Sequence, residues 1–79
     1  MNKYALNILK FAYSQYQNSN SDSCSVQLSG NANDIVALRN ALRNLESDGY
    51  IGNVFYDGLL ITFDLSAIGV ESMRGNGKF

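Results

Sequence analysis

Histidine is absent from this sequence of 79 residues, and cysteine occurs once, at Cys24. A single cysteine cannot form a disulfide within the chain, which excludes a small secreted scaffold held together by disulfides. A zinc site needs about four ligands, mostly cysteine and histidine, and one chain of this composition cannot supply them. A nucleophilic cysteine needs a base, usually histidine. We therefore expect no metal and no cofactor, and we expect Cys24 to be a half-buried thiol beside a strand.

The acidic residues do not indicate an active site either. They are scattered along the chain at Asp22, Asp34, Glu46, Asp48, Asp57, Asp64 and Glu71. Acid–base catalysis by carboxylates needs suitably placed groups that meet in space, and nothing in this spacing suggests such a pair. No glycine-rich phosphate-binding loop precedes a helix. The sequence thus predicts that the protein is not an enzyme.

Two further features are missing: long apolar runs and an excess of basic residues. Polar residues interrupt the apolar N-terminal stretch, so it does not look like a signal peptide, and no apolar run approaches the length of a membrane span. We therefore expect a cytoplasmic protein without a membrane partner. Six Lys and Arg against seven Asp and Glu give a net charge of −1, which argues mildly against strong nonspecific binding to nucleic acid.

The composition that remains is that of one small globular domain. Apolar residues make up 46% of the chain and charged residues 16%, values typical of a folded protein. A chain of this length buries only a modest core. We expect a single domain at residues 1–73 and a frayed tail at residues 74–79.

Apolar spacing predicts a first helix, then a loop and a short strand. Apolar residues recur at three- and four-residue steps in residues 3–16, which is the spacing of a helix. Residues 17–25 are rich in Ser and Asn, which bond their own backbone and favour a loop. Residues 25–28 alternate between polar and apolar, as a short edge strand does.

A second helix is predicted at about residues 32–47, where Ile35, Leu38, Leu42 and Leu45 share one face. Asn31 or Asn33 should cap its first turn, and Asp34 is well placed there against the helix dipole. Gly49 should end the helix in a left-handed conformation.

A β-hairpin follows, with strands at residues 50–56 and 59–65. Asp57 and Gly58 between them are typical of a two-residue turn, which would pair Tyr56 with Leu59. This register places the inner face at Tyr50, Gly52, Val54, Tyr56, Leu59, Ile61, Phe63 and Leu65, and the outer face at Ile51, Asn53, Phe55, Leu60, Thr62 and Asp64. Ser66 should cap a short C-terminal helical turn.

Three strings of this sequence resemble winged helix-turn-helix proteins. Residues 42–51 (LRNLESDGYI) are similar to the join between recognition helix and wing, residues 59–65 (LLITFDL) to the second wing strand, and residues 65–69 (LSAIG) to the step after the wing. Together they resemble small winged-helix proteins of bacteria and their phages, including the YjcQ-like group. The resemblance covers about residues 31–73 and implies an α+β, winged-helix-like domain.

This sequence departs from those proteins in two places. The helix that normally precedes the recognition helix has little room between Leu28 and Ala32, so it would be reduced to a turn or lie within an irregular stretch. The wing is short, and its tip carries Asp57 rather than Lys or Arg.

The resemblance implies that the second helix lies in the major groove of double-stranded DNA and that the protein is a transcriptional regulator. Its exposed face would contact DNA through Val36, Arg39, Asn40, Arg43, Asn44 and Ser47. Arginine can bond guanine edges or phosphates, and asparagine can bond adenine edges. With so few basic residues a monomer would bind weakly, so a dimer is expected. The alternative is an ordinary solvated helix face.

A protein-interaction module is the competing functional hypothesis, for example a phage-encoded inhibitor or adaptor. Ile51, Phe55 and Leu60 would form an apolar cluster on the outer hairpin face that helices on the inner face cannot cover, and such clusters usually mark a partner site. A homodimer through this cluster is compatible with either function. The alternative is that the C-terminal turn covers the cluster through Ile68 or Met73.

Overall fold

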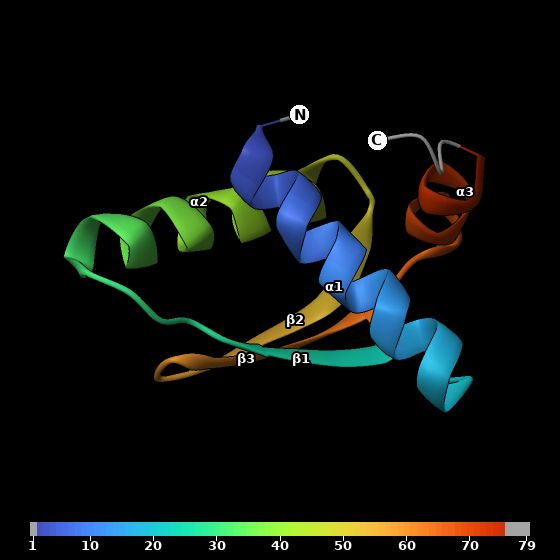
Figure 1. Ribbon diagram of the computed structural model, residues 1–79, viewed down its shortest axis with the longest axis horizontal. Coiled ribbons are helices and arrows are strands. Elements are labelled where there is room, and N and C mark those ends of the chain that lie inside the picture. Colours follow the sequence, from blue (N-terminus) through green and yellow to red (C-terminus); the bar gives the residue numbers. More distant parts are fainter. Residues whose placement is uncertain (1, 76–79) are drawn as a thin grey trace.

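Three helices and three strands follow one another along residues 2–75, the part of the chain that the computed structural model describes (Figure 1). In order they are α1 (Lys3–Ser19), β1 (Ser23–Gln27), α2 (Ala32–Ser47), β2 (Ile51–Asp57), β3 (Leu60–Leu65) and α3 (Ala67–Gly75). The strands form one antiparallel sheet in the order β1-β3-β2, so β3 is central. The predicted α+β class is confirmed.

Helix α1 is longer than predicted. It begins after Asn2, whose side-chain oxygen accepts a hydrogen bond of 2.8 Å from a first-turn N–H, and it continues to Ser19. Asn20 ends it with a left-handed φ of 60°, a conformation that asparagine tolerates better than most residues. The predicted loop at residues 17–25 is therefore wrong at both ends: residues 17–19 extend the helix, which Asn20 caps, and residues 23–25 belong to β1. Only residues 20–22 connect α1 to β1.

Strand β1 lies at an edge of the sheet, as predicted, but it begins two residues earlier. Cys24 lies within it and is fully buried, not half-buried beside it. The side chain of Gln15 donates to the Ser25 carbonyl at 2.8 Å and accepts from the Ser25 N–H at 3.1 Å. A helix side chain thus occupies backbone groups at the free edge that another strand would need.

Helix α2 spans the predicted residues and is capped at both ends. Asn31, not Asn33, is the N-cap: its side chain accepts the Asp34 N–H at 2.9 Å, and the Asp34 carboxylate accepts the Asn31 N–H at 3.3 Å. This reciprocal pair is a capping box. At the other end Gly49 adopts a φ of +85°, and its N–H and the following one donate to carbonyls of the last turn. These two bonds form the Schellman motif that the glycine predicts.

The hairpin forms between β2 and β3, but its turn and register differ from the prediction. Asp57 pairs with Leu60, so the turn residues are Gly58 and Leu59. Gly58 supplies a φ of +60° at the first central position, and a turn of this kind needs a positive φ only there. The register is therefore shifted by two residues from the predicted pairing of Tyr56 with Leu59.

A β-bulge in β2 reverses the faces of its first residues. The register shifts by one residue between Gly52 and Phe55, where Asn53 has a φ of 51° and donates to the Asp64 carboxylate at 2.7 Å. One extra residue in one strand exchanges the two sides of the sheet. Ile51 consequently enters the core and is 3% exposed. The predicted outer position of Ile51 is wrong, as is the inner position of Gly52, whereas Phe55 keeps its outer position.

The residues after β3 form a nine-residue helix rather than a short turn. Ser66 caps it as predicted: its hydroxyl oxygen accepts the Gly69 N–H at 3.0 Å and lies 2.8 Å from the Tyr50 carbonyl oxygen, to which it can donate. The predicted tail begins inside this helix, which includes residues 74 and 75. The rest of that tail, residues 76–79, lies outside the described residues.

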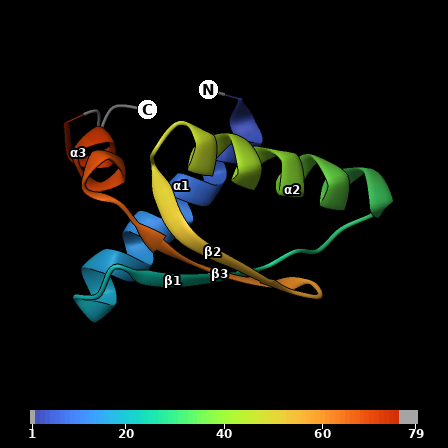
Figure 2. The ribbon, with the colours of Figure 1, turned by 180° about the vertical axis from the view of Figure 1, so that it is seen from behind.

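The core lies between the helices and one face of the sheet (Figures 1 and 2). Its buried apolar residues are Ala5, Ile8, Leu9, Ala12, Cys24, Leu28, Ala41, Leu42, Leu45, Ile51, Ile61, Phe63, Leu65 and Met73. Burial alternates along β3, so the side chains between the core residues point to the opposite face. This arrangement leaves the outer face of the sheet and one face of α2 uncovered.

Candidate functional site

The exposed face of α2 carries most of the residues predicted to contact DNA. Along this face, at steps of four, three and four, are the exposed residues Val36, Asn40, Arg43 and Ser47. Such spacing aligns them in one stripe, which we call the α2 stripe. Asn44 is also exposed and lies beside it. The α2 stripe contains no carboxylate. The nearest acidic residue of the helix, Glu46, lies about a quarter-turn around the helix from the stripe.

Arg39 has a different role from the one predicted. It is half-buried, and its Nη2 donates to the Gly58 carbonyl at 3.2 Å. Its Nε is buried and has no hydrogen-bond partner among residues 2–75. Arg39 therefore holds the tip of the hairpin beneath the N-terminal half of α2 (Figure 2). Nothing in the sequence indicated this contact, because it depends on the register and turn that bring Gly58 to the hairpin tip.

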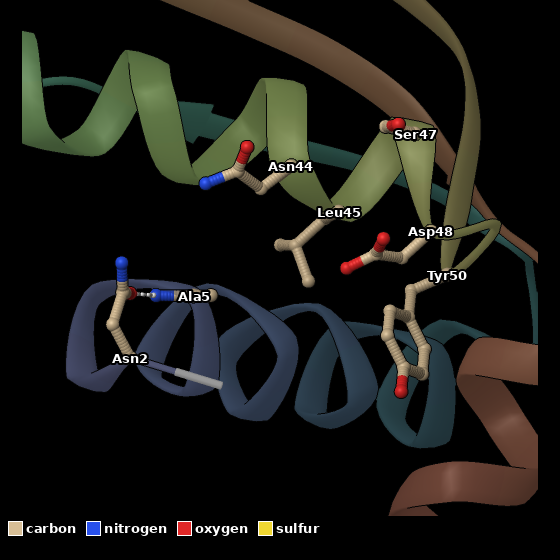
Figure 3. A pocket seen from close by; sticks show the side chains of 7 residues that line it. All are labelled: Asn2, Ala5, Asn44, Leu45, Ser47, Asp48 and Tyr50. Atoms are coloured by element: carbon tan, nitrogen blue, oxygen red, sulfur yellow. Dashed lines mark hydrogen bonds between the residues drawn. The ribbon is translucent and has the colours of Figure 1, made fainter.

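A cavity of about 250 Å³ lies where the C-terminal end of α2 approaches the N-terminal end of α1 (Figure 3). Its lining residues are Asn2, Ala5, Asn44, Leu45, Ser47, Asp48 and Tyr50. The Asp48 carboxylate extends from the end of α2 toward α1 (Figure 3). This charge adds to the negative end of the helix dipole, and both repel phosphate. DNA contact is therefore better suited to the middle of α2 than to the end at Asn44 and Ser47.

The outer face of the hairpin exposes two large apolar side chains, which we call the hairpin patch. Phe55 is 63% exposed and Leu60 is 43% exposed. Ile51, the third predicted member, is in the core and does not belong to it. Met73 is buried in the core as well, and Ile68 is itself 59% exposed. Helix α3 therefore does not cover the hairpin patch through the residues proposed for that role.

Cys24 is held as a neutral thiol. Its sulfur lies 3.5 Å from the Ala12 carbonyl oxygen and 3.4 Å from that of Asp22, to which the thiol can donate. Burial raises the pKa of the thiol above its ordinary value, and the nearby carboxylates of Asp64 and Asp22 raise it further. A buried thiol with a raised pKa is a poor nucleophile. The arrangement favours packing over catalysis at Cys24.

We expect iodoacetamide to modify Cys24 at least about tenfold more slowly in the native protein than in urea, because attack needs an exposed thiolate. Mass spectrometry over time measures both rates. Equal alkylation rates in the two states would contradict burial.

The raised pKa of Cys24 also gives a pH dependence. The thiol ionises at a lower pH in the unfolded chain than in the folded protein, so the free energy of unfolding should fall as the pH rises above the ordinary thiol pKa.

No protein-family model matches this chain, and no curated protein matches it in sequence. None of the helices in residues 2–75 is long and apolar enough to span a membrane. Across the same part of the chain, no group of three or more His, Cys, Asp or Glu side chains is placed to hold a metal ion. The α2 stripe and the hairpin patch are the two predicted surfaces that the structure leaves exposed.

Proposed function

We propose that this protein is a small winged-helix-like DNA-binding protein, a cytoplasmic transcriptional regulator that acts as a dimer. Helix α2 is the recognition helix, and the β2–β3 hairpin is the wing. The observation that carries the proposal is the α2 stripe, an exposed helix face with hydrogen-bonding side chains and no carboxylate. The element order agrees with such a domain, except that residues 28–31 are too few for a further helix between β1 and α2.

The side chains of the α2 stripe suit the edges of base pairs. Arg43 can donate two hydrogen bonds to guanine, Asn40 can bond adenine, and Val36 can contact a thymine methyl group. Arg39 supports the site indirectly, because it holds the hairpin against the same helix. Asp48 caps the C-terminal end of α2 and Asp57 ends β2 at the hairpin tip, so a carboxylate opposes phosphate contacts at each of these places.

The low positive charge is the reason to propose a dimer. The chain has a net charge of −1, and the α2 stripe contains one arginine. Nonspecific affinity for DNA grows with the number of phosphates that Lys and Arg neutralise, so a monomer would gain little. A two-fold dimer doubles the contacts and places two recognition helices about one DNA turn apart.

Titration of the purified protein with random genomic fragments tests the proposal. We expect retention of DNA at about 50 mM salt and strong weakening at about 200 mM, because counterions are released on binding. Fragments recovered at the higher salt should share a sequence with two-fold symmetry. Absence of retention at the lower salt would overturn DNA binding.

A second candidate function is a protein-interaction module, and the hairpin patch favours it. Phe55 and Leu60 are exposed apolar residues on a sheet face that no helix covers. Contiguous exposed apolar surface costs solubility and is typical of partner sites. The same patch could hold the two copies of the DNA-binding dimer together.

Phe55→Asp should abolish dimerisation, or the capture of a protein partner, while the fold is preserved, because Phe55 contributes little to the core. Ser14→Asp is the matched control: it adds the same charge at an exposed position of α1, which packs on the opposite face of the sheet from the hairpin patch. Sedimentation velocity gives the assembly state, and circular dichroism checks the fold. Equal assembly states in the two variants would exclude the hairpin patch as an interface.

A further inference from the structure

An apolar groove of about 370 Å³ lies between α1, β1 and α2, away from the α2 stripe. Its lining residues are Asn7, Ile8, Phe11, Val26, Gln27, Leu28 and Leu38. Five of the seven are apolar and none is charged. Phe11 lines the groove, and its large apolar side chain is 51% exposed. The connection at residues 28–31 is too short to cover this surface.

We infer that this groove is a docking site for an acidic amphipathic helix of a partner protein. A helix offers apolar side chains at positions i, i+3 or i+4, and i+7, which match a trough walled by two helices. The inference does not depend on DNA binding.

The edge of β1 argues against an extended peptide as the occupant. A peptide that adds to a sheet edge needs a row of unpaired backbone groups. Gln15 already bonds both the N–H and the carbonyl of Ser25, with distances of 3.1 and 2.8 Å. The Ser23 N–H donates to the Ser21 hydroxyl oxygen at 3.2 Å. Among the outward-facing residues of β1 within residues 2–75, only Gln27 then has neither backbone group bonded to a side chain, which is too little to hold a strand.

Charge selects an acidic partner over a second copy of this chain. Helix α1 carries Lys3 and Lys10 and no carboxylate. The nearest acidic residue on α2, Asp34, is engaged by the Asn31 N–H and lies 3.4 Å from the Tyr4 hydroxyl. Two copies joined through this groove would bring four lysines together against only the two Asp34 carboxylates, an excess of positive charge. A helix with Asp or Glu beside its apolar face would instead pair with these lysines.

Selection from a displayed library of randomised helical peptides, with the full chain as bait, tests the inference. Enriched peptides should carry large apolar residues on one face and Asp or Glu beside them. Their affinity should fall at least tenfold for Phe11→Glu and at least threefold for Lys10→Glu. Ile68→Glu on α3, where the parent side chain is 59% exposed, is the matched control and should bind as the parent does. Thermal unfolding of each variant verifies that it is folded.

Any of four results from the peptide selection would overturn the inference: no enriched family of peptides, enriched peptides with Lys or Arg beside the apolar face, equal binding by Phe11→Glu, or equal binding by Lys10→Glu. Self-association of the protein alone that Phe11→Glu removes would assign the groove to a second copy, which also overturns it. The Lys10→Glu variant keeps the test decisive if Phe11→Glu does not fold.

Discussion

Gly69→Ala is expected to lower the free energy of unfolding by about 2 kcal/mol, in the range of other overpacking substitutions. Helix propensity alone predicts the opposite sign, since alanine stabilises a helix interior by about 1 kcal/mol relative to glycine. The structure decides between them. A methyl group at Gly69 would collide with the Tyr50 carbonyl oxygen and would lie 2.8 Å from Leu65 Cδ1. The backbone carbonyl cannot move without disturbing its hydrogen bond from the Ser66 N–H.

Gly75→Ala is the control, because Gly75 belongs to the same helix and a methyl group there would meet nothing within 4 Å. We expect it to be neutral or slightly stabilising. Urea unfolding followed by circular dichroism gives both free energies, and the Gly69→Ala loss corresponds to a melting temperature lower by roughly 8–16 °C. Equal stability of the two variants would show that α3 does not pack as closely on Tyr50 as described.

Arg43→Ala should weaken DNA binding by at least about 30-fold, because a dimer loses two arginine contacts worth about 1–3 kcal/mol each. The fold should be unaffected, since Arg43 is exposed and its side chain makes none of the hydrogen bonds or ion pairs found within residues 2–75. Fluorescence anisotropy with a duplex recovered from genomic fragments measures the affinity. Arg39→Ala should weaken DNA binding less than Arg43→Ala does. It should also lower the free energy of unfolding, because the hairpin tip loses its hydrogen bond to α2.

Lys10→Ala is the matched control for Arg43→Ala, because it removes the same charge from α1 instead of α2. We expect an affinity within about threefold of the parent, since only general attraction to phosphate is lost. If both variants lose affinity equally, the protein attracts DNA by its overall charge and α2 makes no base-specific contacts.

Local patterns predicted the elements well where the backbone is regular. Helix α2 was predicted at its observed bounds, because its apolar spacing, Asn31, Asp34 and Gly49 all indicate the same two ends. Ser66 as a cap was predictable for the same reason. Where several short polar residues compete, as at residues 17–25, local preference does not decide whether they extend a helix or form a loop.

The hairpin was predictable in kind but not in detail. Its turn residues shift by one because Gly58 can serve at either central position of a two-residue turn. The bulge at Asn53 depends on a bond to Asp64, eleven residues away, which no local pattern encodes. That single extra residue moved Ile51 from the predicted hairpin patch into the core. A register error of this kind changes the composition of a surface, not only its geometry.

The candidate site was predicted in part. The exposure of Val36, Asn40, Arg43 and Ser47 follows from helical periodicity and was expected. The contact between Arg39 and Gly58 joins residues nineteen positions apart and required the structure. The groove beside Phe11 was missed, although the lack of room between Leu28 and Ala32 was the signal that a surface there would stay open.

The most direct measurement of the central claim is a chemical-shift map of the ¹⁵N-labelled protein with a recovered DNA duplex. We predict that the largest changes occur at the backbone amides of Val36, Asn40 and Arg43 and at the side-chain amide of Asn40. Amides of α3 and of the outer sheet face at Ser25 should stay unchanged unless they join the dimer. Changes confined to α1 or α3, with α2 undisturbed, would contradict the account of α2 as the DNA-reading helix.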